Sequence, residues 1–201
     1  MSRSSRLNLP ADDEIVVVMR DGRLTTEAYL EGPETAAPQE LVYGVLRDAP
    51  APTPRHQDTV GMIYRQLQTY FERTRTGKAW ISPIDVILDR DNALVVQPDV
   101  IALMRDRLHI VTDRVWGAPD LVVEVLSPTP RMGRLSERVE WFAQYGVREC
   151  WLVHQLSTLV DVIAFADGRV QATRVFHGQD LIASALLPNL TVTPRLLVDG
   201  Y

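Results

Sequence analysis

Apolar and polar positions recur along this chain with two different periods, which predict helices and strands in alternation. Over residues 56–75, apolar side chains recur every three or four positions, which predicts an amphipathic helix with one buried face. Residues 134–145 show a similar pattern, and Gly146 follows as a stop signal. Shorter apolar runs bounded by turn residues predict strands. The order strands, helix, strands, helix, strands predicts an α/β domain with a mixed β-sheet flanked by helices.

The predicted strands are spread over the whole chain. Residues 24–30 suit either a strand or a short helix, and residues 105–114 suit a loop. Asp167-Gly168 is a turn signal between two alternating segments, which predicts a C-terminal hairpin over 159–176. The remaining predicted strands cover residues 14–19, 40–46, 80–88, 93–103, 121–126 and 150–153.

Length and composition indicate one compact domain. The 201 residues are 46% hydrophobic, and we expect a polar lead over 1–13 followed by a single domain over 14–201. No run of eighteen apolar residues is present, so we expect no membrane span. No adequate apolar stretch follows the basic N-terminus, so we expect no secretory signal. Cys150 is the only cysteine, which rules out an internal disulfide and suits a reducing cytoplasm.

The charge of the chain is mildly acidic. A formal net charge of −5 is unlike the strongly basic surface of a dedicated nucleic-acid-binding domain. It leaves a nuclease open, because a local basic face or a bound cation can offset an acidic total. The cationic residues are almost all arginine, and Lys78 is the only lysine. Any chemistry that needs a lysine therefore has a single candidate.

Two of the predicted strands carry an acid inside an apolar run. Asp99 stands in Gln97-Pro98-Asp99-Val100, and Glu124 stands in the strand over 121–126. A buried carboxylate is costly unless it is paired, protonated or bound to a metal. Two acids on neighbouring strands can share one divalent cation, which is the working part of many nucleases. The alternative is that Asp99 caps a turn after Pro98 and that Glu124 pairs with an arginine.

Several segments, taken in their order along the chain, resemble one protein family. The strongest are Leu-Val-Val-Glu-Val-Leu-Ser-Pro over 121–128 and the segment over 137–153, which ends in Gln-Tyr-Gly-Val-Arg-Glu-Cys-Trp-Leu-Val. This ordered set resembles the Uma2 family of restriction-endonuclease-like proteins, in the PD-(D/E)XK nuclease superfamily, over residues 38–165. The earlier matching segments are Glu40-Leu-Val-Tyr-Gly44, Arg55-His56, Ser82-Pro-Ile-Asp85 and Gln97-Pro-Asp-Val100.

The resemblance implies a restriction-endonuclease-like core, extended here by N-terminal strands and the C-terminal hairpin. It implies that Asp99 and Glu124 hold a Mg²⁺ or Mn²⁺ ion, which prefers oxygen ligands. Asp85 is a further candidate ligand, and Glu40 is an additional acid; for both, pairing with an arginine is the alternative. His56 stands near a helix start, where the helix dipole disfavours its charged form, and it is either a hydrogen-bond donor to the acids or a packing residue.

The chain departs from the family pattern where a lysine is usual. Leu126 occupies the superfamily's lysine position, and Arg138 occupies the position on the following helix where Uma2-like sequences carry one. A guanidinium can contact a phosphate or stabilise charge in the transition state, but it cannot act as a general base. The resemblance therefore implies a metal-dependent DNA endonuclease with weakened activity, which we expect to be a homodimer.

Two other functions fit the same residues. One is a catalytically inactive nuclease-fold protein that binds nucleic acid or a protein partner. The other is an oligomerisation protein in which the hairpin over 159–176 builds a dimer edge.

Overall fold

The computed structural model describes residues 19–20, 22–33, 38–48, 51–126 and 135–200. The helices are α1 (Thr26–Leu30), α2 (Pro54–Thr74), α3 (Leu135–Tyr145) and α4 (Pro194–Asp199), and η1 (Arg105–Ile110) is a 3₁₀ helix. The strands are β1 (Met19–Arg20), β2 (Arg23–Leu24), β3 (Gln39–Val42), β4 (Val45–Asp48), β5 (Gly77–Ile81), β6 (Val86–Asp89), β7 (Leu94–Val96), β8 (Val100–Met104), β9 (Val115–Trp116), β10 (Leu121–Leu126), β11 (Glu149–His154), β12 (Leu159–Ala166) and β13 (Arg169–His177).

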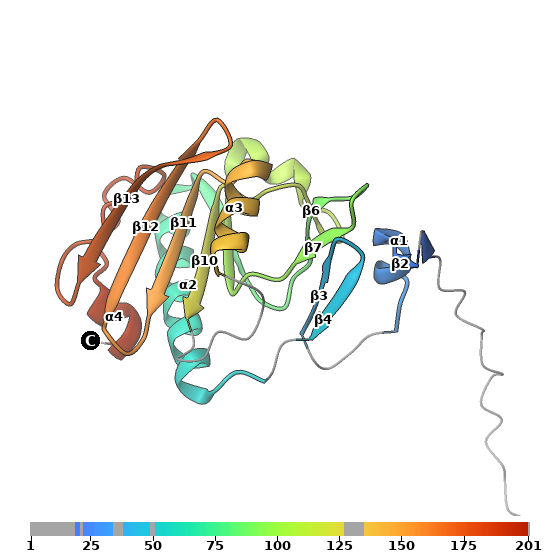
Figure 1. The fold of residues 1–201 in the computed structure, drawn as a ribbon. Coiled ribbons are helices and arrows are strands. Elements are labelled where there is room, and N and C mark those ends of the chain that lie inside the picture. The colour runs from blue at the N-terminus through green and yellow to red at the C-terminus, as the bar shows by residue number, and fades with distance from the viewer. Residues whose placement is uncertain (1–18, 21, 34–37, 49–50, 127–134, 201) are drawn as a thin grey trace, which may run out of the picture.

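Two mixed sheets form the body of the fold, which confirms the predicted α/β class. The larger sheet has the order β13-β12-β11-β10-β8-β5, with β10 and β11 parallel. The second sheet has the order β4-β3-β7-β6-β9, with β6 and β9 parallel. Strands β1 and β2 form a separate pair. In Figure 1, α2 lies behind the larger sheet and α3 lies in front of it, while β3 and β4 lie to the side of β10.

Alternate residues of the central strand β10 serve two separate cores. Val123 faces the core that contains Ile63 of α2, whereas Val122 faces the core that contains Phe142 of α3. This alternation follows from the two-residue repeat of a strand. Because both faces are covered, β10 reads as a nearly continuous apolar run in the sequence.

Helix α2 forms where the apolar periodicity predicts it. The Thr53 side chain accepts a hydrogen bond from the backbone N–H of His56, and Pro54 occupies the first turn, where its missing N–H costs nothing. Arg75 ends the helix in the left-handed conformation, with φ of 59°. The buried face contains Thr59, Val60, Ile63, Leu67, Tyr70 and Phe71. None of the helices that the structure describes is long and apolar enough to cross a membrane.

The predicted strands over 40–46 and 80–88 are wrong because each is divided in two. The strand predicted over 40–46 is the hairpin of β3 and β4, since Tyr43 and Gly44 both have positive φ. The strand predicted over 80–88 is divided between β5 in the larger sheet and β6 in the second sheet. A proline within an apolar run marks such a break, because it cannot donate a ladder hydrogen bond.

Of the other predicted segments, one strand is divided and the C-terminal hairpin is confirmed. The predicted strand over 93–103 is divided in the same way at Gln97-Pro98-Asp99, with β7 and β8 in different sheets. Residues 24–30 form β2 and α1, and the predicted loop over 105–114 contains η1. The C-terminal hairpin is confirmed as β12 and β13. Most of the strand predicted over 14–19 lies outside the described residues.

Candidate active site

Asp99 and Glu124 meet where β8 and β10 begin to separate. The antiparallel register of these strands ends at Val123 opposite Val100, and Glu124 and Asp99 are the next residues along on either side of that last pair. Asp99 is fixed there by its Oδ2, which accepts a hydrogen bond from the backbone N–H of Val125 at 2.7 Å. Residues opposite one another on neighbouring antiparallel strands lie close enough for their side chains to interact. The structure therefore brings the two predicted acids together.

Arg138 of α3 joins Glu124 to a third acid, Glu40 of β3. Its Nη1 donates to both oxygens of Glu40, at 2.9 and 2.7 Å, and its Nε and Nη2 donate to Oε1 of Glu124, at 3.1 and 2.5 Å. Arg138 is 5% exposed, and its guanidinium also lies over the ring of Phe142. The guanidinium is therefore bound on two sides by carboxylates. We call Glu40, Asp99, Glu124 and Arg138 the acid cluster.

Glu40 of the second sheet is linked to Glu124 of the larger sheet through Arg138. Besides accepting from Arg138, its Oε1 accepts a hydrogen bond from the backbone N–H of Gln97 at 2.7 Å. Its side chain is 2% exposed. Both carboxylate oxygens of Glu40 thus accept hydrogen bonds from the protein. This is the alternative given above for Glu40, in which it pairs with an arginine.

The acid cluster contains three acids and one arginine, and these side chains are mostly buried. Burial raises the pKa of Glu124 to about 7; Arg138 opposes this shift, and the nearby charges of Asp99 and Glu40 add to it. Burial acts to lower the pKa of Arg138, but Glu124 and Glu40 outweigh burial and raise that pKa above its ordinary value. Arg138 therefore stays cationic, and burial disfavours the charged form of Glu124.

His56 approaches the cluster from the start of α2. Its Nε2 lies 3.1 Å from Oδ1 of Asp99, and its Nδ1 is buried without a partner among the described residues. The hydrogen bond to Asp99 raises the pKa of His56, and the charge of Glu124 adds to this, while burial opposes it. The net effect is a pKa of His56 above its ordinary value.

Asp85 sits in a neighbouring polar network. Its Oδ1 accepts hydrogen bonds from Nε2 of Gln97 at 2.8 Å and from the Tyr29 hydroxyl at 3.1 Å, and its Oδ2 pairs with Arg114 at 3.1 Å. Gln97 links this network to Glu40 through its backbone. The sequence singled out Gln97 only as part of the Gln-Pro-Asp segment, and no pattern pointed to Tyr29 or Arg114.

The donor set fits a cation that keeps most of its water. Among the described residues, no group of three or more His, Cys, Asp or Glu side chains is arranged to hold a metal. Both hydrogen bonds from Arg138 to Glu124 use Oε1, which leaves Oε2 for another partner. Mg²⁺ is commonly held by one or two carboxylates together with water and substrate phosphate. Asp99 and Glu124 would hold such an ion, and Glu40 would not.

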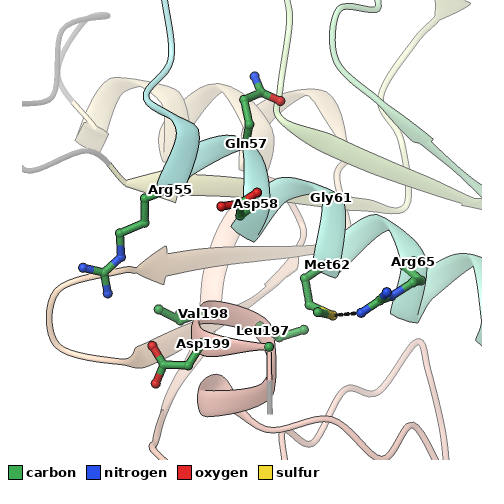
Figure 2. Close-up of a pocket in the computed structure, with 10 residues that line it drawn as sticks. Arg55, Gln57, Asp58, Gly61, Met62, Arg65, Leu197, Val198 and Asp199 are labelled. Atoms are coloured by element: carbon green, nitrogen blue, oxygen red, sulfur yellow. Dashed lines mark hydrogen bonds between the residues drawn. The ribbon is translucent and has the colours of Figure 1, made fainter.

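A groove of about 500 Å³ lies apart from the acid cluster, between α2 and α4 (Figure 2). Its charged lining residues are Arg55, Asp58, Arg65 and Asp199, two of each sign. Neither His56 nor any residue of the acid cluster lines this groove. The groove therefore offers no concentration of positive charge for a phosphate backbone.

Comparisons with known proteins place the chain in a family. It matches the family model of Uma2, described as "Putative restriction endonuclease", over residues 26–195. The crystal structure of "a putative nuclease belonging to DUF820" from Anabaena variabilis has a similar fold, with a TM-score of 0.74 and 18% sequence identity over 88% of this chain and 98% of that chain. A search of curated proteins found no match. Because the family match spans most of the chain, the protein belongs to the Uma2 family.

Proposed function

We propose that this protein is a metal-dependent DNA endonuclease that hydrolyses phosphodiester bonds. The observation that carries the proposal is the placement of Asp99 next to Glu124 beyond the last pair of β8 and β10, with one oxygen of Glu124 held by Arg138 and the other without a hydrogen bond to any described residue. A Mg²⁺ or Mn²⁺ ion on these carboxylates would polarise the phosphate and supply an activated water.

In this mechanism Arg138 positions Glu124. Its donors are taken up by Glu40 and Glu124, and it is nearly fully buried, so its guanidinium has little freedom to reach a phosphate. It fixes the rotamer of Glu124 and offsets part of the negative charge of the acid cluster. A guanidinium does not release its proton in proteins, so Arg138 does not accept one from water.

The test is nicking of supercoiled plasmid DNA with Mg²⁺, with Mn²⁺ and with EDTA. We expect cleavage that needs the cation and that falls at least about a thousandfold in Glu124→Gln and Asp99→Asn, since losing the cation removes several kcal/mol of transition-state stabilisation. Glu137→Gln is the matched control. Glu137 is next to Arg138 in sequence, but its side chain is exposed and its ion pair with Arg47 is long, at 4.0 Å. Absence of cleavage by the unmodified protein with both metals would contradict the proposal.

The second candidate is a nuclease-fold protein that binds nucleic acid without cutting it. The observation that favours it is that Arg138, which is engaged by two acids, stands in the acid cluster where a lysine is usual. It predicts DNA binding that weakens steeply with salt and is unchanged by Glu124→Gln. DNA binding that ignores salt would exclude it.

A further inference from the structure

Two arginines that solvent reaches lie at the rim of the acid cluster. Arg47 of β4 is paired across the β3–β4 hairpin with Glu40, which belongs to the cluster. Arg55, in the first turn of α2, directly precedes His56, whose imidazole contacts Asp99. The mechanism above gives neither arginine a role.

Arg47 is held beside the acid cluster by strand pairing. Residues opposite one another on antiparallel strands point to the same face, with Cβ atoms roughly 5 Å apart. Arg47 therefore stands on the same face of the hairpin as Glu40. Its side chain is 35% exposed, and its Nη1 lies 4.0 Å from Glu137 of α3, which is too far for a hydrogen bond. Arg47 donates no side-chain hydrogen bond to the described residues, so its guanidinium is available to another anion.

Arg55 is oriented by one hydrogen bond to the larger sheet. Its Nη2 donates to the backbone oxygen of Gln155 at 2.9 Å, in the turn that follows β11. This turn lies at the end of the sheet that carries Glu124, because His154 at the end of β11 is paired with Leu126 at the end of β10. Arg55 is exposed and extends outward from α2 (Figure 2). Its Nε and Nη1 donate to no described residue, so they are available to another anion.

The two arginines approach the cluster from opposite faces of the larger sheet. Arg47 lies near Glu137 of α3, which covers one face, and Arg55 belongs to α2, which covers the other. Between them lies the end of β10 with Glu124. A phosphate backbone that crosses this end of the sheet would therefore pass one arginine on each side of the carboxylates.

Charge explains why a nucleic acid needs positive groups here. The acid cluster has three carboxylates and one guanidinium, and a divalent cation would offset only this excess of negative charge. The chain as a whole also carries a formal net charge of −5. The phosphates beside the scissile one therefore need positive partners outside the cluster. An exposed guanidinium with free donors presents a planar fork that fits phosphate oxygens.

We infer that Arg47 and Arg55 bind backbone phosphates of duplex DNA on the two sides of the acid cluster; this inference rests on the proposed function. Contacts to phosphate do not depend on base sequence, and each one releases about one condensed counterion from the duplex. The contacts do not involve the cation, so they are measured by binding in its absence.

The experiment measures binding of a fluorescein-labelled DNA duplex by fluorescence anisotropy in EDTA over a range of NaCl concentrations. Arg47→Met and Arg55→Met should each weaken binding and reduce the slope of log Kd against log salt by about one, and the double variant should reduce it by about two. Arg105→Met is the matched control. Arg105 is exposed and follows β8 at the end away from Asp99, roughly 20 Å along the strand, so this variant should bind like the full chain.

Lysine variants separate the charge of these residues from their structural contacts. Arg47→Lys and Arg55→Lys keep a positive charge at each position, so they should retain most of the salt slope. If they lose as much of it as the methionine variants do, the effect is not phosphate neutralisation and the inference fails.

The outcomes separate this inference from the proposed function. If the full chain cleaves DNA and the double methionine variant keeps the affinity and salt slope of the full chain, the inference fails and the proposed function stands. If the double variant loses the slope but the full chain cleaves no DNA with either metal, the inference stands and the proposed function fails. A full chain that binds no duplex in EDTA overturns the inference, whatever the nicking assay shows.

Discussion

At the scale of single residues, Arg138 decides how the acid cluster is held together. A lysine ammonium is a single point charge, whereas the planar guanidinium presents separate donors to Glu40 and to Glu124 at once. Arg138, which stands where a lysine is usual, therefore has a structural role. It joins α3, β3 and β10 through one buried side chain.

Removing this guanidinium should be costly. Arg138→Met keeps the length of the side chain but leaves two buried carboxylates without their cation, so the free energy of unfolding should fall by about 3–5 kcal/mol. Arg47→Met is the matched control, because Arg47 is half-exposed and its pairing with Glu137 spans 4.0 Å, so the loss there should stay within about 1 kcal/mol. Urea denaturation measures both. Equal, small losses would show that Arg138 does not hold the cluster.

Single-residue patterns could locate the acids but could not separate their roles. Asp120 precedes the same apolar strand as Glu124 and is fully buried, yet its carboxylate pairs with Arg107 and Arg148 and accepts from the backbone of Met104. Both acids look alike in the sequence. Only their partners, which come from other segments, show that Asp120 is a structural ion-pair centre and that Glu124 keeps one oxygen without a hydrogen bond to the described residues.

At the scale of elements, the junction of α2, β5 and β8 orients the helix that carries His56. Gly77 begins β5, and a Cβ added there would lie 2.3 Å from the backbone oxygen of Leu103 and 2.8 Å from the ring of Phe71. The close approach of helix and sheet therefore requires a glycine at this position. A glycine is needed at position 77 because of these close contacts and not because of its backbone conformation.

Two glycine substitutions test this packing in opposite directions. Gly77→Ala should lower the free energy of unfolding by about 1–3 kcal/mol, because backbone and ring must move apart. Gly61→Ala, inside α2 with open space around its Cβ, should raise it by up to about 1 kcal/mol through helix propensity. Thermal melts of the two variants give the comparison. A stabilising Gly77→Ala would contradict the described packing.

Helices were predictable from the sequence to a greater degree than strands. The apolar period over 56–75 predicts α2 to within two residues, because its stripe is long and its ends carry clear stop signals. The run over 93–103 reads as one strand because both halves are apolar, although Pro98 within it is a residue that marks a break. The sequence does not show that β7 and β8 belong to different sheets, and that division is what places Asp99 beside Glu124.

At the scale of the whole molecule, the two-sheet arrangement brings the acid cluster together from three directions. Glu40 comes from the second sheet, Glu124 from the larger sheet, Asp99 from the connection between β7 and β8, and Arg138 from α3. The C-terminal hairpin lies at the far edge of the larger sheet, where β13 is mostly exposed (Figure 1). The cluster and this edge are therefore separate surfaces.

A protein with one hydrolytic site per chain needs two copies to cut both strands of a duplex at once. We therefore expect a twofold dimer, with a mass of about twice 22.7 kDa by light scattering at micromolar concentration. If the β13 edge forms the contact, Thr173→Pro in the middle of that strand should give monomers, because proline removes a backbone donor. A monomeric mass for the unmodified protein would remove the dimer from the account.

Anomalous diffraction from crystals soaked in Mn²⁺ tests the central claim most directly, since it locates the ion without relying on turnover. We expect one peak within coordination distance of both Asp99 and Glu124, with Arg138 still bound to Glu40 and to Oε1 of Glu124, and no such peak in Glu124→Gln. A soaked crystal without a peak between Asp99 and Glu124, or with a peak that contacts only one of them, would contradict the claim that these two acids hold one catalytic cation.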